Sequence, residues 1–262
     1  MVNYYIGTMG FAYKDWSGVF YPAGLASRDF LSYYSTIFNA VEIDSTFYGI
    51  PKNEVVNRWK ESSPEDFKVS VKVPREITHE AGLVDAEVNM GRFIDRVKLL
   101  GRKLGVILLQ FPPSFKYSKE DILDSFLGHL PKDISYAVEF RHKSWYVPKT
   151  ADLLVTHNIC WVATEYKGVP KEVEVTSDKL FIRFVGQHGR FHRHDLEQID
   201  VVPQLETWWE WIRSVADGVS EIFIFFNDDF SGFAPASANK LKKIIGLPVI
   251  EPVHPKQMTF FE

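Results

Sequence analysis

The chain has 262 residues, of which 45% are hydrophobic, and it carries a net charge of −4. A chain of this length can bury one large core, and its acidic balance argues against a protein that binds nucleic acid through a basic overall surface. No apolar run approaches the ~20 residues that cross a bilayer, the N-terminus does not resemble a signal peptide, and Cys160 has no partner for an intrachain disulfide, so we expect a soluble cytoplasmic protein.

Eight short apolar segments recur along the chain and are typical of β-strands. Their apolar stretches are nearly continuous, as in parallel strands that helices cover on the outside. We predict strands at residues 4–7, 40–43, 67–72, 106–110, 135–139, 160–164, 180–184 and 221–226.

Helical patterns separate most of these strands. Ser27 is predicted to cap the first helix, and Gly101 is predicted to end the third. The segment from Glu165 to Asp178 is too short and too strand-like for a helix, so none is expected between the sixth and seventh strands. The seven predicted helices lie at residues 28–38, 53–62, 89–101, 118–130, 150–158, 203–218 and 235–246.

This alternation predicts an α/β fold, a TIM (β/α)₈-type barrel that lacks one helix. We expect a single barrel domain at residues 1–250 and a C-terminal tail at residues 251–262. The alternative is an open doubly wound sheet, which often carries a glycine-rich first turn. Residues 7–18 read GTMGFAYKDWSG and lack the G-x-G-x-x-G spacing, which favours the barrel.

Polar residues follow six of the eight strands where the barrel would open. Because side chains alternate along a strand, we expect these residues to point toward one mouth, where TIM barrels place their ligands. Buried charges are costly unless they are paired, so mutual pairing plus an anionic ligand would explain the set, and structural ion pairs alone are the alternative. The set is Glu42, Lys72, Gln110, Glu139 with Arg141, Arg183 and Asn227.

These residue types suggest roles in binding a phosphate and moving a proton. Arginines bind phosphate in bidentate geometry, so we assign phosphate binding to the cationic members of the set, which are Lys72, Arg141 and Arg183. Gln110 and Asn227 are candidates for substrate binding. Glu42 or Glu139 could act as a general base or orient the arginines, and His79 could titrate near neutral pH.

Aromatic and histidine residues in the predicted loops allow two interpretations each. Tyr48 and Trp145 could stack on a base or sugar of the substrate, or they could anchor the loops by packing. The sequence HGRFHRHD contains His188, His192 and His194, which we interpret as a solvated basic loop rather than a metal cluster. The strand ends are rich in Lys, Arg, Gln and Asn, so we expect no metal and no cofactor.

Seven motifs occur in the order GTMGFAYKDWSGVFYP, FNAVEIDSTFYGIP, FKVSVKVPREITH, LGVILLQFPPSF, VEFRHKSW, LFIRFVG and FNDDFSGFAPASANKL. Together they resemble the domain-of-unknown-function family 72, the YecE-like proteins, over residues 6–247. The family usually has Ser where Met9 stands and Asn where Asp44 stands. The resemblance implies a TIM barrel without a settled activity, and its motif positions are Glu42, Lys72, His79, Gln110, Glu139, Arg141, Arg183 and Asn227.

The C-terminal tail raises the question of a protein partner. Gln257, Phe260 and Phe261 resemble the tails that dock on sliding clamps, although their spacing is contracted and an anchored tail is the alternative. We expect no membrane partner.

Three functions remain open at this point. The first is a metal-independent hydrolase or lyase, phosphoesterase- or nuclease-like, that acts on a phosphate-bearing small molecule or on nucleic acid. The second is a non-catalytic module that binds a nucleotide or single-stranded nucleic acid. The third is a sugar-phosphate isomerase or aldolase, which the fold allows without favouring.

Overall fold

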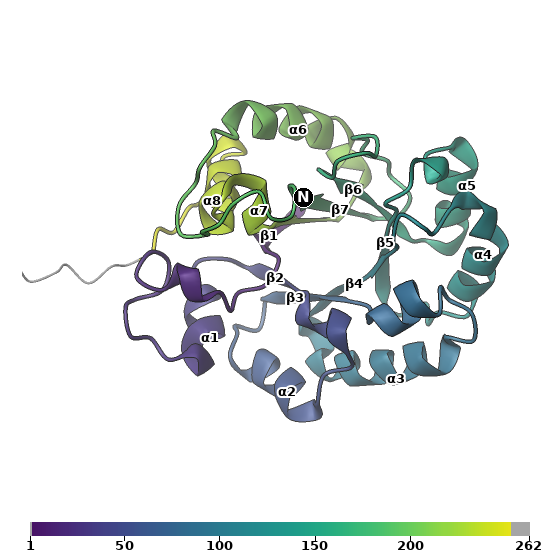
Figure 1. Ribbon diagram of the computed structural model, residues 1–262, viewed down its shortest axis with the longest axis horizontal. Helices are drawn as coiled ribbons and strands as arrows, with labels where there is room; N and C mark the ends of the chain where they lie inside the picture. The colour runs from purple at the N-terminus through teal and green to yellow at the C-terminus, as the bar shows by residue number, and fades with distance from the viewer. Residues whose placement is uncertain (1, 253–262) are drawn as a thin grey trace, which may run out of the picture.

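Eight parallel strands form a nearly closed barrel in the computed structural model, which describes residues 2–252 (Figure 1). From β2 to β8 each strand pairs with the next strand in chain order, and β8 also pairs with β1. The predicted TIM-type barrel and all eight predicted strands are therefore confirmed. The strands are β1 (Asn3–Thr8), β2 (Ala40–Ile43), β3 (Lys68–Lys72), β4 (Leu104–Gln110), β5 (Ser135–Glu139), β6 (Cys160–Thr164), β7 (Lys179–Phe184) and β8 (Glu221–Phe226).

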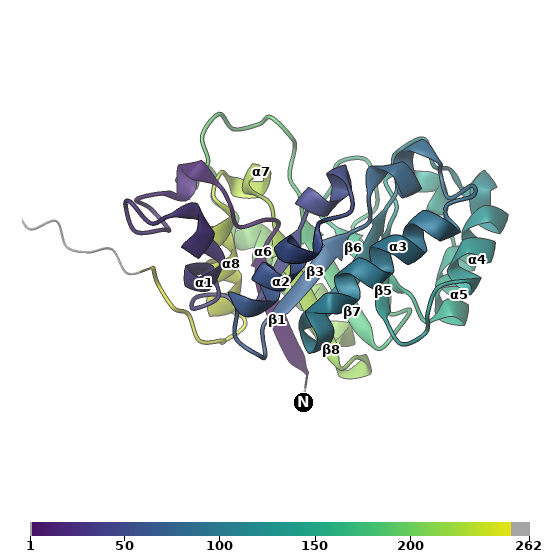
Figure 2. The same ribbon diagram turned by 90° about the horizontal axis from the view of Figure 1, so that it is seen from below.

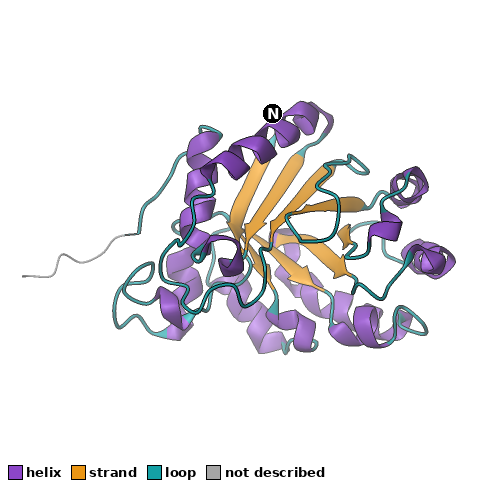
Figure 3. Cartoon of the chain, turned by 45° about the horizontal axis from the view of Figure 1, so that its top comes forward, coloured by secondary structure: helices purple, strands orange, loops and turns teal. Residues whose placement is uncertain are grey.

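Helices surround the strands on the outside, as Figure 3 shows. Residues 165–178 contain no helix, as predicted. The first helix begins with a 3₁₀ turn at Ser27–Asp29 and lacks a side-chain cap, so the predicted cap at Ser27 is wrong. The helices are α1 (Phe30–Tyr34), α2 (Asn53–Glu61), α3 (Glu87–Val97), α4 (Glu120–Gly128), α5 (Pro148–His157), α6 (Val202–Val215), a short unpredicted α7 (Asp228–Ser231) and α8 (Ala234–Ile244).

The strands separate two apolar clusters because their side chains alternate between the two faces. Outward residues such as Val41, Val69 and Val71 pack against the helices. A smaller cluster fills the inside of the barrel and includes Leu108 and Phe181. A residue two positions further along the same strand points the same way, so Gln110 and Arg183 also point into the barrel. They lie at the C-terminal ends of the strands, and we call this end of the barrel the mouth.

Side chains close the barrel between β1 and β2. Among residues 2–252 no ladder joins these two strands, and a single bridge connects Met9, just after β1, to Glu42 of β2. The Tyr34 hydroxyl accepts the Thr8 N–H at 2.8 Å and donates to the Ala40 carbonyl at 3.0 Å. The two strands approach so closely that a Cβ on Gly7 would lie 1.9 Å from the Ala40 carbonyl oxygen.

The two ends of the barrel differ. The N-terminus lies at one end, and at the other a long loop at residues 185–201, between β7 and α6, arches over α7 (Figure 2). No helix within the described part of the chain is long and apolar enough to cross a membrane. The proposed clamp-binding residues Gln257, Phe260 and Phe261 lie outside the described residues.

Candidate functional site

Arg183 of β7 is the centre of an ion network inside the mouth. Its Nε and Nη2 donate to the two carboxylate oxygens of Glu42, at 2.9 and 2.6 Å, and its Nη1 donates to Glu139. Arg141 donates from Nε to the other oxygen of Glu139 at 2.9 Å. Both glutamates are fully buried, so β2, β5 and β7 are linked across the barrel by charge-assisted hydrogen bonds.

Lys72 of β3 belongs to the same group but lacks an anionic contact. Its Nζ lies 4.0 Å from the centre of the Phe47 ring, and within residues 2–252 it forms no ion pair or hydrogen bond. The terminal nitrogens of Arg141 likewise have no hydrogen-bond acceptor among the described residues, and its guanidinium lies on the ring of Tyr166 at 4.4 Å. Two cationic groups at the mouth therefore keep free donors.

The two buried glutamates differ in protonation. Burial raises the pKa of Glu42 to about 8; Arg183 opposes this effect and nearby Asp44 adds to it. Burial acts on Glu139 as well, but Arg183 and Arg141 outweigh it and lower the pKa to about 2. Glu42 contacts one guanidinium, that of Arg183, whereas Glu139 contacts the guanidinium groups of both Arg183 and Arg141. Glu42 is therefore the carboxyl group that can carry a proton near neutral pH.

His79 lies on a single π-helical turn after β3, at Glu76–Glu80. Burial, followed by the positive charges of Lys72 and Arg141, lowers its pKa to about 4. The imidazole is therefore neutral at pH 7, and the predicted titration of His79 near neutrality is wrong. Its Nδ1 lies 2.8 Å from the Thr78 hydroxyl, and its ring meets the Phe47 ring edge-on.

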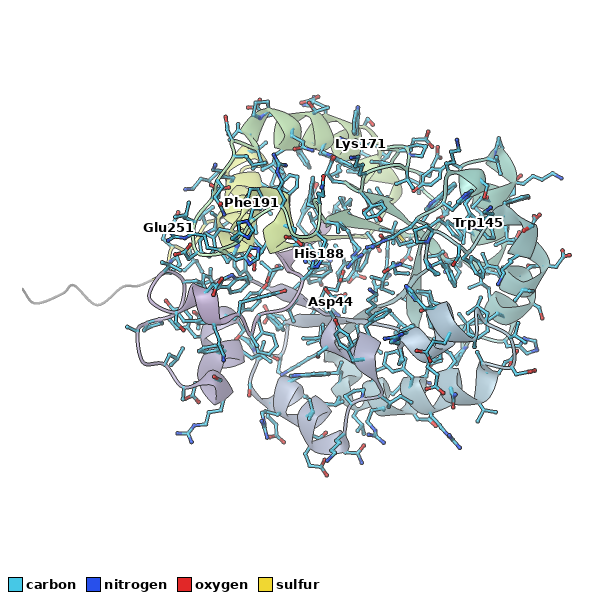
Figure 4. The ribbon with its side chains drawn as sticks, in the orientation of Figure 1. Asp44, Trp145, Lys171, His188, Phe191 and Glu251 are labelled. Atoms are coloured by element: carbon cyan, nitrogen blue, oxygen red, sulfur yellow. The ribbon has the colours of Figure 1, made fainter. Side chains whose placement is uncertain are left out.

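Gln110 and Trp145 are engaged in local packing. The Gln110 amide donates to the Phe111 carbonyl at 2.8 Å, next to Glu139 in the β4–β5 register. Trp145 is fully buried, stacks on Phe140 at 4.2 Å and donates its indole N–H to the Phe115 carbonyl. In Figure 4 it lies toward the rim of the barrel, near α5. The structure thus gives Trp145 the loop-anchoring role and leaves it no surface for a ligand.

A cleft of about 700 Å³ opens beside the ion network, between the loops that follow β1, β2, β7 and β8. Asp44 joins the two features, because it lines the cleft while its Oδ1 lies 3.7 Å from Arg183 Nη2. Within the part of the chain that the structure describes, the lining contains Asp residues and no Lys or Arg, so the cleft is acidic where the sequence had suggested a cationic mouth. Its polar and aromatic lining residues are Phe11, Tyr13, Asp44, Ser45, Tyr48, Trp59, His188, His194, Asn227, Asp228 and Asp229.

Several of these lining residues were missed by sequence reasoning. Alternation already placed Asp44 on the same face as Glu42, and that signal could have assigned it to the site. Asp228 is buried, which raises its pKa to about 7, and it accepts the indole N–H of Trp16 at 3.2 Å. No sequence pattern connects positions 16 and 228, so this contact could not have been predicted.

The histidine loop is held by carboxylates. His188 Nδ1 lies 3.1 Å from Asp229 Oδ2, and the His194 backbone N–H donates to Asp15 at 3.2 Å. In Figure 4 His188 and Asp44 both lie over the middle of the barrel, and both line the cleft. Across residues 2–252, no three His, Cys, Asp or Glu side chains form a group that could hold a metal ion.

Comparison with known proteins identifies relatives along the whole chain. The UPF0759 protein YunF of Bacillus subtilis is 25% identical over 98% of this chain and 99% of its own length. The UPF0759 protein YecE of Escherichia coli is 34% identical over 142 residues, which are 54% of this chain and 50% of that protein. These names state no reaction.

Solved structures show the same fold. A DUF72 family protein from Thermotoga maritima has a TM-score of 0.78 and 31% identity, covering 93% of this chain and 99% of that chain. One from Enterococcus faecalis has a TM-score of 0.77 at 22% identity and supports the fold alone. A family model described as a protein of unknown function, DUF72, matches residues 5–258. The resemblance seen in the sequence motifs is thus confirmed, and the chain belongs to the DUF72 family.

Proposed function

We propose that this protein is an enzyme, a hydrolase or lyase, that binds the anionic group of a phosphate-bearing substrate at Lys72 and Arg141. The observation that carries the proposal is that these two cations keep free N–H donors among the described residues, although Lys72 is nearly buried. The Lys72 side chain is largely removed from water, and an anion would give both cations a charge-assisted hydrogen-bond acceptor.

We assign different roles to the two glutamates. Where the surroundings raise the pKa of one carboxyl group and lower that of another, the first can carry a proton and the second stays charged. Glu42, with a pKa of about 8, is the proton carrier, and its pKa suits transfer near neutral pH. Glu139 stays ionised and orients Arg141 and Arg183. His79 is neutral and offers a hydrogen bond beside Lys72.

Binding of inorganic phosphate, measured by titration calorimetry at low ionic strength, tests the anion site. Lys72→Met keeps the apolar stem against Phe47 and should weaken binding at least about tenfold, as should Arg141→Gln, because each charge-assisted hydrogen bond is worth about 1.5–3 kcal/mol. The control is Lys242→Met on α8, since Lys242 also lies over an aromatic ring, Phe38, but is only half-buried and lies away from the mouth. Equal phosphate affinity in the wild type and Lys72→Met would refute the site.

Turnover is tested separately from binding. The chromogenic esters p-nitrophenyl phosphate and bis(p-nitrophenyl) phosphate report phosphomonoester and phosphodiester hydrolysis. Glu42→Gln should lose about 10²-fold or more in kcat while it retains phosphate binding within a few-fold, because it loses proton transfer and keeps the shape of the network. Phosphate binding without turnover of any phosphate ester would instead favour the non-catalytic nucleotide-binding role.

A second candidate, a sugar-phosphate aldolase, is favoured by Lys72 itself. Burial, with Arg183 as a further cause, lowers its pKa to about 8, so a fraction of the amine is neutral at pH 7. Such an amine attacks a carbonyl carbon, the oxygen leaves as water, and the resulting imine accepts the electron pair of the breaking C–C bond. Dihydroxyacetone phosphate with borohydride should then label the wild type and leave Lys72→Met unlabelled; an unlabelled wild type would exclude this candidate.

A further inference from the structure

The acidic cleft is a built cavity in which one carboxylate, Asp44, is partly exposed to a ligand. Asp228 already accepts hydrogen bonds from the Trp16 indole and the Ala234 backbone, and Asp229 is in contact with His188. Asp44 differs, because its side chain is 34% exposed, while its Oδ1 is buried 3.7 Å from Arg183 Nη2. The exposed part of this carboxylate can therefore accept a hydrogen bond from a ligand in the cleft.

An exposed aromatic ring stands at the same cleft. Tyr48 lines it and is 80% exposed, so its ring is accessible to a ligand in the cleft. Tyr48 packs edge-on against Phe47, and Phe47 in turn carries Lys72 on its face. The short turn Ser45–Tyr48 therefore connects the cleft to the proposed anion site.

The cleft offers acceptors and an aromatic face, whereas Lys72 and Arg141 offer donors. A phosphorylated sugar has the complementary pattern, because its ring hydroxyls donate hydrogen bonds, its C–H faces pack on aromatic rings and its phosphate accepts. The cavity volume of about 700 Å³ lies within the range of small-molecule sites. A second phosphate would be repelled by the carboxylates of the cleft.

We infer that the cleft binds the sugar ring of a phosphorylated sugar, with Asp44 accepting hydrogen bonds from its hydroxyls and Tyr48 packing against its face. This inference rests on the proposed function, because it takes Lys72 and Arg141 as the phosphate site. It adds the substrate class and names Asp44 as the residue that distinguishes a sugar phosphate from inorganic phosphate.

Calorimetry with inorganic phosphate, ribose 5-phosphate and AMP tests the inference on the full chain. The wild type should bind ribose 5-phosphate about tenfold or more tightly than inorganic phosphate, since one hydrogen bond to a carboxylate is worth about that factor. Asp44→Ala should reduce this preference to about twofold or less. The same variant should bind inorganic phosphate more tightly, because it removes a negative charge beside Lys72 and Arg183.

Tyr48→Ala provides a second variant that should fold normally, since the side chain is exposed. It should lower the preference for ribose 5-phosphate about threefold to tenfold. Trp211→Ala is the matched control, because Trp211 is an exposed aromatic residue on α6 that does not line the cleft. This control should leave the preference unchanged.

The outcomes separate this inference from the proposed function. Phosphate binding that depends on Lys72, without any preference for ribose 5-phosphate, would overturn the sugar subsite alone. A preference for AMP without one for ribose 5-phosphate would assign the cleft to a base and overturn it as well. Absence of phosphate binding in the wild type would remove the proposed function and the subsite together.

Discussion

Arg183 donates hydrogen bonds to two buried glutamates, Glu42 of β2 and Glu139 of β5. If it is replaced, Glu42 and Glu139 remain buried without their shared partner. Breaking a buried ion pair in this way costs about 3–5 kcal/mol. We therefore expect Arg183→Met to lower the free energy of unfolding by about that amount, measured by urea denaturation at pH 7.

A triple variant is the control for this prediction. Glu42→Gln, Glu139→Gln and Arg183→Met together remove both the carboxylates and the guanidinium. Because neither carboxylate remains buried without its guanidinium, the triple variant should be more stable than Arg183→Met alone. A loss below about 1 kcal/mol for the single variant would show that water reaches the glutamates and that the network is not closed.

The residues of the network could be predicted from the sequence, but their pairing could not. The period of two along a strand is enough to bring Glu42, Glu139 and Arg183 to one mouth. Which carboxylate a guanidinium contacts depends on the strand register and on side-chain rotamers, and neither can be read from one chain. For this reason the sequence predicts the same phosphate-binding role for Lys72, Arg141 and Arg183. In the structure Arg183 hydrogen-bonds to Glu42 and Glu139, whereas Lys72 Nζ bonds to neither.

Among the elements, the boundary between β1 and β2 depends on side chains rather than on a strand ladder. Besides Tyr34, the amide of Asn39 accepts the Ile6 N–H at 3.0 Å and donates to the Tyr4 carbonyl at 2.8 Å. Apolar periodicity predicted both strands, but it carries no information about such bridges. The sequence could therefore predict a barrel but not how its first two strands are joined.

Tyr34→Phe tests the importance of this junction. Loss of the hydroxyl leaves the buried Thr8 N–H and Ala40 carbonyl without their partner, so we expect a loss of about 1–3 kcal/mol in the free energy of unfolding. The amide proton of Thr8 should also exchange faster with solvent. Tyr48→Phe is the control for stability, because the Tyr48 side chain is exposed; equal urea midpoints for both variants would contradict the bridging role.

Loops were the elements for which the sequence was least informative. Trp145 and Tyr48 both follow a strand and both are aromatic, yet one is fully buried and the other is 80% exposed. Packing against Phe140 and Phe115 decides the first case, and both contacts depend on how two neighbouring loops fold. Loop aromatics therefore needed coordinates before a role could be assigned.

At the scale of the whole molecule, the net charge of −4 does not reveal that cationic and acidic groups are separated at the mouth. The mouth holds three cations, Lys72, Arg141 and Arg183, and three carboxyl groups, Glu42, Asp44 and Glu139. Among residues 2–252, the adjacent cleft is lined by carboxyl groups without any Lys or Arg. The overall charge of a chain does not show which charged residues lie next to each other. The sequence can thus predict that charged residues gather at the barrel mouth. Only the structure shows that hydrogen-bond donors lie on one side of the mouth and acceptors on the other.

The buried positive charge of Lys72 should lower the free energy of unfolding, and this effect can be measured. Burial lowers the pKa of this amine to about 8, so the charged form destabilises the folded state at pH 7. Lys72→Met should therefore raise the free energy of unfolding by about 1–3 kcal/mol, since one pKa unit corresponds to about 1.4 kcal/mol, while it weakens phosphate binding. Lys242→Met should raise it less.

The increase in the free energy of unfolding caused by Lys72→Met should depend on pH in a direction that the lowered pKa of Lys72 determines. The folded chain binds fewer protons at Lys72 than the unfolded chain does between pH 8 and about 10.5, so the wild type gains stability as the pH rises through this window. The advantage of Lys72→Met should be full below pH 8 and shrink toward pH 10.5 in urea denaturation curves. An advantage that stays constant across this window would mean that packing of the methionine, and not the buried charge, causes it. A variant that is more stable at neutral pH but deficient in phosphate binding would show that the barrel retains a destabilising lysine for its ligand.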